Sequence, residues 1–225
     1  MFKRKNNQDF FQFDEITIEN LSNDFKKLLT NFSEDESKIN EIISFVISKY
    51  SEKHRYYHNL SHVRALLLSA ENFKEKFLDF ESVQLAIWFH DAIYAPKRFD
   101  NEIESAKLAS SKLSELNLPK VIIEKVEKII LATQKHDATD LDFDGKLFLD
   151  LDLGILGADE NIYQNYKSAI RQEYSFVPWF LYRRSRAKIL ANFLNRATIY
   201  FTNELRDRLE TKARRNIENE IKELL

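Results

Sequence analysis

The sequence predicts a single all-α domain of about nine helices, and three observations carry that prediction. Apolar residues recur at helical spacing almost throughout the chain. The 225 residues include only 3 Gly and 3 Pro, where average usage would give roughly 16 and 11. So few turn-forming residues exclude β-sandwiches, β-barrels and glycine-rich phosphate loops. A content of 44% hydrophobic and 31% charged residues is typical of a folded helical protein.

Recognisable start signals order the helices of the first half. Ser33 with Glu36 forms a capping-box pattern, Asn59 is a candidate N-cap, and Asn101 precedes another apolar repeat. Pro119 suits the first turn of a helix. The segment 80–94 is apolar nearly all round, which predicts a buried central helix. The helices expected here cover about 33–50, 59–73, 80–94, 101–113 and 119–130.

The second half begins with one clearly polar break at 135–145, which ends in an Asp-Gly turn signal. A short helix over about 146–155 should follow and stop at Gly157. Further apolar repeats predict helices over about 162–174, 178–200 and 205–221. With no linker or repeat, we expect one domain over 1–225, with a site-bearing core at about 54–156 and C-terminal helices at 159–225 packed on it.

Composition limits the compartment and the partners. The chain has no Cys, which excludes disulfides, thiolate catalysis and Cys-ligated zinc. Its first residues lack the apolar run of a signal peptide, and no stretch approaches 18 consecutive apolar residues. We therefore expect a cytoplasmic protein with no membrane partner. The net charge of −2 gives no bulk basic field for nucleic acid, although it leaves a local patch open. The last helix packs either within the chain or against a second copy in a homodimer.

All five histidines lie between positions 54 and 136. His58 and His62 are four residues apart, and with Asn59 as the cap His58 precedes the helix and His62 lies in its first turn. Both rings could then face one cavity. Neutral histidine is the commonest metal ligand. Two surface histidines near a helix start would give the same pattern.

The His90-Asp91 pair stands in the most apolar segment of the chain. A carboxylate there is costly to bury unless a positive group pairs with it. A divalent cation would pair with both side chains. A satisfied His-Asp pair at a frayed helix end is the alternative, since Tyr94 and Pro96 follow closely.

Two further carboxylates, Asp150 and Asp152, are two residues apart and point in different directions on a helix. At most one should reach a shared site, and the other is a cap or a surface charge. The nearby run Asp140, Asp142, Asp144 resembles the opening of an EF-hand loop. The twelfth position of such a loop requires a bidentate Glu but is Leu151, so a solvated acidic loop is the better interpretation.

Taken together, these residues resemble the ordered H…HD…D signature of the HD-domain metal-dependent phosphohydrolases. The segment YHNLSHV is locally similar to the YHNxxH motif of cyclic-nucleotide phosphodiesterases in that superfamily. A closer resemblance is to a group of predicted HD-type phosphohydrolases with RxYHxxxH, FHDxxY, NExxSA, Txx-His, LDxDLxILG and a C-terminal AR-N. The corresponding segments here are RYYHNLSH, FHDAIY, NEIESA, TQKH, LDLDLGILG and ARRN, from about residue 40 to the end. The phosphodiesterases' nucleotide-clamping segment has no counterpart that can be placed, so cyclic-nucleotide specificity is not carried over.

The resemblance implies a site that binds one or two divalent ions (Mn²⁺, Mg²⁺, Zn²⁺, Ni²⁺ or Fe²⁺) and a phosphorylated small molecule, such as a nucleotide. It implies an acid role for His58 toward the leaving group, a bridging role for Asp91 and a water-orienting role for Asp152. His136 matches the extra His of binuclear members, with a phosphate contact or a plain loop His as alternatives. The implied metal ligands are His62, His90, Asp91, Asp152 and, in the binuclear case, His136.

Cations near these motifs are candidates for holding the substrate's phosphate. Arg55 adjoins the histidine pair and Lys97 follows the HD segment. Through the resemblance Asn101 and Glu102 line the pocket, although a helix cap explains them nearly as well. The expected activity is hydrolysis of a phosphate ester or anhydride. A non-catalytic module that binds metal and nucleotide, a di-iron oxygenase of HD type and a purely structural helical protein remain the alternatives.

Overall fold

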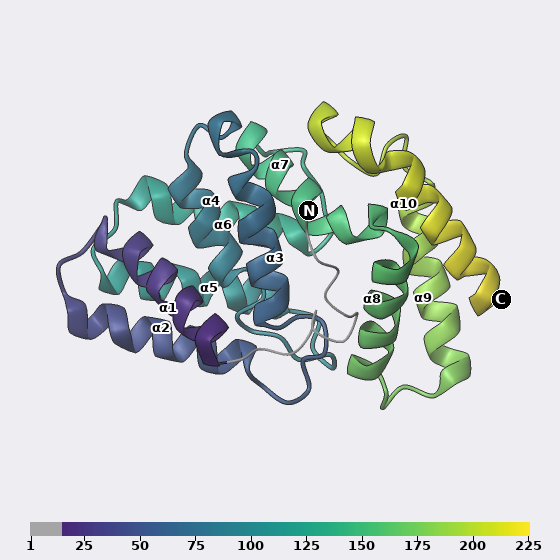
Figure 1. The fold of residues 1–225 in the computed structure, drawn as a ribbon, viewed down its shortest axis with the longest axis horizontal. Coiled ribbons are helices and arrows are strands. Elements are labelled where there is room, and N and C mark those ends of the chain that lie inside the picture. Colours follow the sequence, from purple (N-terminus) through teal and green to yellow (C-terminus); the bar gives the residue numbers. More distant parts are fainter. Residues whose placement is uncertain (1–14) are drawn as a thin grey trace. The chain divides into compact units, whose positions relative to one another are not determined.

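The computed structural model describes residues 15–225, and helices are their only regular secondary structure. Ten α-helices and two short 3₁₀ segments follow one another along this part of the chain (Figure 1). The prediction of an all-α protein of about nine helices is confirmed. None of the helices within 15–225 combines the length and apolar character that a membrane span requires.

The contacts divide the chain into two compact units, with the boundary between Lys135 and His136. The boundary falls inside the segment 54–156, which the sequence predicts to form one site-bearing core. The helices described in unit 1 are α1 (Glu15–Thr30), α2 (Glu36–Tyr50), α3 (Leu60–Glu71), η1 (Lys74–Lys76), α4 (Phe80–Phe89), α5 (Asn101–Glu115) and α6 (Lys120–Thr133). Those of unit 2 are α7 (Phe143–Asp152), η2 (Leu153–Gly157), α8 (Glu160–Glu173), α9 (Trp179–Leu194) and α10 (Asn203–Leu224).

Helix α4 is the centre of unit 1, as its all-round apolar sequence predicts. It contacts α3, α5 and α6, and the five residues Leu85–Phe89 are all buried. The indole of Trp88 stacks on the ring of Phe25 from α1, with the ring centroids 4.2 Å apart. Each such fully buried side chain contributes about 1.5–3 kcal/mol. Burial on all sides therefore fixes the position of the His-Asp pair that follows α4.

One predicted N-cap is wrong by two residues. Asp35, and not Ser33, caps α2, because its carboxylate accepts the backbone N–H of Lys38. The Ser33 hydroxyl instead accepts the N–H of Asp35, and aspartate is as good an N-cap residue as serine. Helix α5 begins at Asn101, where the sequence predicts a start, and Asp100 before it makes no side-chain capping bond.

Two predicted helix ends are also wrong. Helix α4 ends at Phe89, before the expected 94, and α9 ends at Leu194, before the expected 200. Beyond α9 the backbone donors bind carboxylates instead of continuing the helix. Glu210 accepts the N–H groups of Ile199 and Tyr200, and Asp150 accepts those of Phe201 and Thr202.

Buried charge joins the helices of unit 2. Arg186 on α9 donates to Glu220 on α10, with Nε and Oε1 2.8 Å apart, and Glu220 also accepts the hydroxyl of Tyr163 on α8. All three side chains are buried. Burial, with the adjacent Glu220 carboxylate, raises the pKa of Tyr163 far above its usual range, so this hydroxyl remains a donor. The pair neutralises two charges that would be costly to bury singly.

Candidate metal centre

A single asparagine places the first two histidines. Asn59 caps α3, and its side-chain oxygen accepts the N–H of Ser61 at 2.8 Å. Its amide also donates to the carbonyl of Tyr56. His58 therefore precedes the helix and His62 lies in its first turn, which confirms the predicted cap and register. The ring centroids of the two histidines are 6.0 Å apart.

The end of α4 places the other pair. His90 follows the last α4 residue, and its Nδ1 lies 2.9 Å from the carbonyl oxygen of Ile87. That carbonyl is an acceptor only, so Nδ1 carries the proton and the neutral ring has a bare Nε2. A histidine held in this way presents the lone pair that a metal ion requires. The apolar helix α4 is thus followed by a histidine whose Nε2 has a fixed orientation.

Three potential ligand atoms converge inside unit 1. Nε2 of His62 and Nε2 of His90 lie 3.1 Å apart. Oδ2 of Asp91 lies 3.1 Å from Nε2 of His90 and 3.8 Å from Nε2 of His62. Two ligands each at about 2.1 Å from one ion, at angles of 90–110°, are separated by about 3.0–3.4 Å. Two of the three separations lie in this range, and the third, 3.8 Å, corresponds to a wider angle of about 130°. Two imidazoles and one carboxylate are thus close enough to share one divalent ion.

The electrostatics of Asp91 favour its ionised form. Burial alone would raise the pKa of this carboxyl, but His90, with contributions from His58 and His62, outweighs burial and lowers the pKa well below its usual range. The backbone N–H of Asp91 faces the hydroxyl oxygen of Tyr50 at 3.3 Å. A carboxylate that stays charged in a largely enclosed place is suited to pair with a cation.

Arg55 fastens the two halves of this site together. Its side chain is fully buried. Its guanidinium donates to the carbonyls of His58, Asp91 and Ala92, at 3.0, 2.7 and 3.0 Å. It also pairs with Glu52 at 3.2 Å. These donors bind backbone that carries the proposed ligands, which is a positioning role, and the substrate contact expected from the sequence stays a prediction.

Two side chains from α5 hold the loop that follows Asp91. Asn101 forms a two-way contact with Ala95, accepting its N–H at 3.0 Å and donating to its carbonyl at 3.1 Å. The Ser105 hydroxyl does the same for Ile93. The motif NEIESA therefore shapes this loop through its Asn and its Ser. The role of Asn101 in lining a substrate pocket stays a prediction.

The remaining predicted substrate residues of unit 1 differ in exposure. Lys97 is exposed and Glu102 is half-buried. Tyr94 is a further residue of this site that the sequence does not predict. Its ring stacks on His58 with centroids 4.3 Å apart, and the Arg55 guanidinium lies over the same ring. The only sequence signal for it is its place in FHDAIY, a segment that resembles a family motif.

Unit 2 contains the other two predicted ligands, and they lie side by side. Nε2 of His136 is 3.0 Å from Oδ2 of Asp152. Asp150 is used differently, because its buried carboxylate accepts three donors from Phe201 and Thr202. Thr202 is the N-cap residue of α10, so Asp150 holds the backbone that leads into this helix.

The expected solvated acidic loop is wrong in its second half, because Asp142 caps α7 by accepting the N–H of Gly145 and Asp144 is buried in the first turn of that helix. Helix α7 therefore begins at Phe143, before the expected 146.

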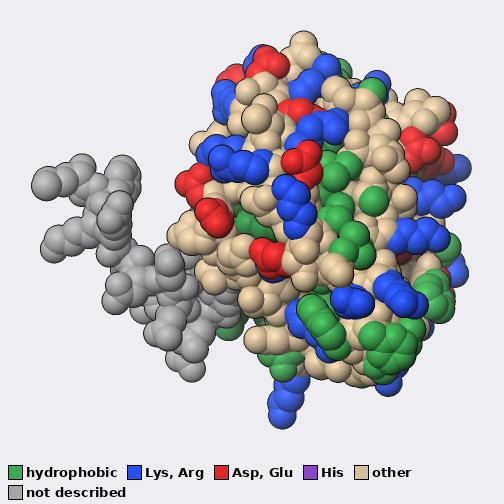
Figure 2. All heavy atoms as spheres, turned by 90° about the vertical axis from the view of Figure 1, so that its right-hand side faces the viewer, with side chains coloured by type: hydrophobic (Ala, Val, Ile, Leu, Met, Phe, Trp, Pro, Cys, Tyr) green, Lys and Arg blue, Asp and Glu red, His purple; other side chains and the backbone are tan. Residues whose placement is uncertain are grey.

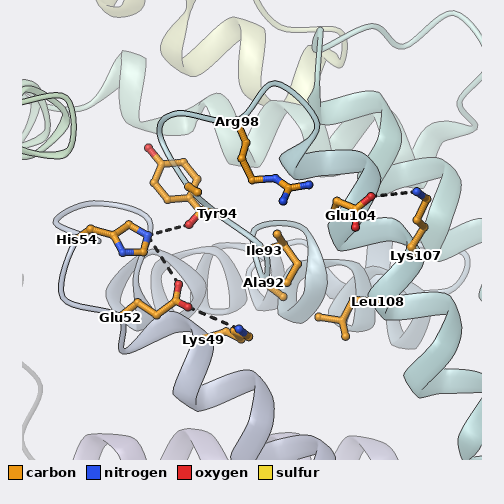
Figure 3. A pocket seen from close by; sticks show the side chains of 11 residues that line it. Lys49, Glu52, His54, Ala92, Ile93, Tyr94, Arg98, Glu104, Lys107 and Leu108 are labelled. Carbon is orange, nitrogen blue, oxygen red and sulfur yellow. Dashed lines mark hydrogen bonds and ion pairs between the residues drawn. The ribbon is translucent and has the colours of Figure 1, made fainter. Parts of the chain in front are cut away.

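A separate pocket of about 530 Å³ lies in unit 1 (Figure 3). None of the predicted metal ligands or substrate residues lines it. In Figure 3 His54 points to the carbonyl of Tyr94, at 2.8 Å, and the cations Lys49 and Lys107 are paired with glutamates. Arg98, which also lines the pocket, pairs with Asp100, so each cation of the lining already has a carboxylate partner.

The fold and the site together define an all-helical protein with a candidate histidine–carboxylate metal centre. Comparison with known proteins adds no family, because no family model, no curated protein and no solved structure matches this chain. The resemblance to HD-type phosphohydrolases stays a prediction from the motifs.

Proposed function

We propose that this protein is a metal-dependent phosphohydrolase that cleaves a phosphate ester or anhydride of a nucleotide or a related small molecule. The observation that supports this most is the convergence of His62, His90 and Asp91 at separations suited to one ion. Two imidazoles and a carboxylate are ligands for a borderline or hard divalent ion. The order of these residues in the sequence, H…HD…D, is the second support.

The site leaves room for chemistry as well as for an ion. Three protein ligands in unit 1 are fewer than the coordination number of most divalent ions, so water and substrate have positions to occupy. A bound divalent ion would polarise a phosphoryl oxygen and lower the pKa of a bound water. His58 stacks on Tyr94 and adjoins His62. In its protonated form it would donate a proton to the leaving oxygen.

We include Asp152 in the proposed metal site because of its place in the H…HD…D sequence pattern. In unit 2 its carboxylate is paired with His136, and Asp150 is already bound to backbone and hydroxyl donors. Of the two, Asp152 is therefore the carboxylate left to serve as the last ligand of the signature. We expect Asp152→Asn to lower metal affinity and turnover without the loss of folding that a change at Asp150 brings.

The test combines metal content with hydrolysis. The purified full chain is loaded with Mn²⁺ and assayed on p-nitrophenyl phosphate, on bis-p-nitrophenyl phosphate and on a panel of nucleotides. His90→Gln and Asp91→Asn should each lower bound metal at least about tenfold and kcat at least about 10²-fold. His54→Gln is the matched control, because His54 lies outside the ligand cluster and binds the Tyr94 carbonyl. It should leave both readouts unchanged.

Three outcomes would contradict the proposal. A folded parent that binds no divalent ion at millimolar concentration removes the metal centre. A parent that binds metal but turns over none of these substrates supports the binding module instead. A bound iron with a visible absorption band would favour the di-iron oxygenase.

A further inference from the structure

We infer, against the expectation of no membrane partner from composition, that the tip formed by the α8–α9 turn and the first turn of α9 is a binding surface for a membrane rich in anionic lipid. This surface, called here the α9 tip, exposes four large apolar side chains. Their exposed fractions are 49% for Phe176, 54% for Trp179, 57% for Phe180 and 46% for Leu181. Contiguous exposed apolar groups of this size are uncommon on a protein that meets only water.

The α9 tip is held in place by its own contacts. Arg171 donates to the carbonyls of Tyr174 and Val177, which fixes the turn. Its guanidinium also lies over the rings of Trp179 and Tyr182, at 5.7 and 4.6 Å from their centroids. Trp179 in turn stacks on Tyr182. Side chains ordered before binding lose less conformational entropy when they meet a partner.

The α9 tip and the helix behind it carry cationic side chains and no acidic ones. From Tyr174 to Asn203 the sequence contains no Asp or Glu. Within this segment Arg184 and Lys188 are exposed, and Arg183 is half-buried. The remaining arginine of the second turn, Arg186, is neutralised by Glu220. Figure 2 shows hydrophobic side chains beside Lys and Arg side chains at the lower end of the face that it draws.

The apolar and basic groups are ordered by depth along α9. Trp179, Phe180 and Leu181 occupy its first turn, and the rise of 1.5 Å per residue places Arg184 about 7.5 Å behind Trp179. A membrane interface has the same order, because apolar and aromatic groups insert about 5–10 Å below the cationic groups that meet the lipid phosphates. The N-terminus of α9 also adds its positive dipole end at the tip.

This order favours lipid over the other occupants. A second copy of the chain docked tip to tip would cover the apolar side chains, but it would leave Arg184 and Lys188, which lie behind them, without an anionic partner. An acidic protein could pair with the cations. The three apolar residues that lie ahead of the cations, however, match a lipid bilayer, in which an apolar layer lies beneath the phosphates. The small net charge of −2 conceals this local field because the acidic residues lie elsewhere in the chain.

Binding is measured by co-sedimentation of the full chain with vesicles. Phosphatidylcholine vesicles with about 30 mol% phosphatidylserine should bind the protein, pure phosphatidylcholine should bind it weakly, and about 0.5 M NaCl should release it. Trp179→Ser with Phe180→Ser should lower partitioning at least about tenfold. Phe99→Ser with Val121→Ser removes apolar side chains that are exposed elsewhere and should change nothing.

The charge contribution has its own variants. Arg184→Gln with Lys188→Gln should lower partitioning about 25-fold, since each cation near an anionic surface is worth about fivefold. Lys53→Gln with Lys128→Gln neutralises two exposed cations of unit 1 and is the matched control. Unchanged binding by either tip variant, or no binding to anionic vesicles at low salt, would overturn the inference.

Tryptophan fluorescence shows which surface inserts. The chain has two Trp, of which Trp88 is 1% exposed and Trp179 is 54% exposed. Anionic vesicles should therefore shift the emission of Trp179 to the blue and protect it from iodide. Trp179→Phe should keep the binding and lose the shift. Vesicle binding without any change at Trp179, or a dimer that Trp179→Ser with Phe180→Ser abolishes, would contradict insertion of the tip.

Discussion

At the scale of single residues, Arg55 connects the two segments that carry the candidate ligands. One guanidinium donates to carbonyls on both sides of the site, at His58 and at Asp91. The rings of Tyr50 and Tyr94 lie against it, at 5.1 and 5.4 Å from the guanidinium carbon. Only a planar group with several fixed donors can serve all these partners, so lysine is not an equivalent replacement.

We therefore predict that Arg55→Lys lowers metal affinity about 10- to 100-fold, as loss of a group that orients ligands does in other metal sites. The ligands themselves are intact, so raised metal concentration should restore binding and activity. Titration with Mn²⁺ followed by calorimetry measures the shift. Arg64→Lys, at an exposed position of α3, is the control. An unchanged affinity in Arg55→Lys would show that the two segments hold their places without the clamp.

The sequence predicts which residues form this site better than it predicts the contacts that each of them makes. His58, His62, His90 and Asp91 could be selected because their spacing and the apolar surroundings are visible in one dimension. The role of Arg55 could not, because its acceptors Asp91 and Ala92 are 36 and 37 residues away and are backbone carbonyls. Backbone acceptors leave no signature in residue type.

At the scale of helices, caps decide where elements begin. Asp35 caps α2, and hydrogen bonding from the backbone of Lys38 lowers the pKa of its carboxyl below the usual range. A carboxyl with a lowered folded-state pKa stabilises the fold above its unfolded pKa of about 3.8 and loses that contribution as pH falls through the folded value.

We predict that, as pH falls below about 4, the melting temperature of the parent falls more than that of Asp35→Asn. The amide oxygen of the variant accepts the same hydrogen bond and does not titrate. Above about pH 5 the difference should be constant. Thermal unfolding followed by circular dichroism between about pH 6 and 2 measures it. Asp24→Asn, at an exposed position of α1, is the matched control.

The start of α10 depends on Asp150 in a comparable way. Its fully buried carboxylate accepts two backbone N–H groups and the Thr202 hydroxyl. Burial raises the pKa of Asp150, and these three donors oppose the rise. All three partners of Asp150 are donors, and a carboxylate offers only acceptor oxygens. An asparagine amide in its place would point its own N–H group at one of these donors.

We predict that Asp150→Asn lowers the free energy of unfolding by about 2–4 kcal/mol, since buried donors left without an acceptor cost about 1–3 kcal/mol each. Asp140→Asn changes an exposed residue of the same acidic segment and should stay within about 0.5 kcal/mol. Urea unfolding with matched m-values provides the comparison. Equal stabilities would mean that the α10 start is held by packing alone.

At the scale of the whole molecule, the chain is built as two compact units with different cores. Unit 1 surrounds an apolar helix, with Trp88 and Phe89 of α4 fully enclosed. Unit 2 instead buries a charged pair, Arg186 with Glu220, among tyrosines. A pair of this kind is strongly destabilising to break, because the remaining charge stays buried.

We predict that Glu220→Gln destabilises unit 2 by about 3–5 kcal/mol and that the loss of hydrogen-exchange protection concentrates in 136–225. Glu223→Gln removes the exposed partner of Lys167, and a surface pair contributes at most about 1 kcal/mol. Hydrogen exchange with mass spectrometry resolves the two units. Equal loss of protection in 15–135 would show that the units unfold as one.

The sequence by itself determined the all-helical class, the central apolar helix, the Asn59 cap and the register of His58 and His62. All of these depend on neighbours within a few residues, where spacing and residue type are sufficient. Only the tertiary structure decided that Arg55 binds backbone carbonyls and that Asp150 holds the backbone that leads into α10, 51 residues later. It also decided that Trp179 and Phe180 face solvent instead of a core. Helical periodicity shows that a side chain is apolar, but whether another element covers it depends on how distant helices pack.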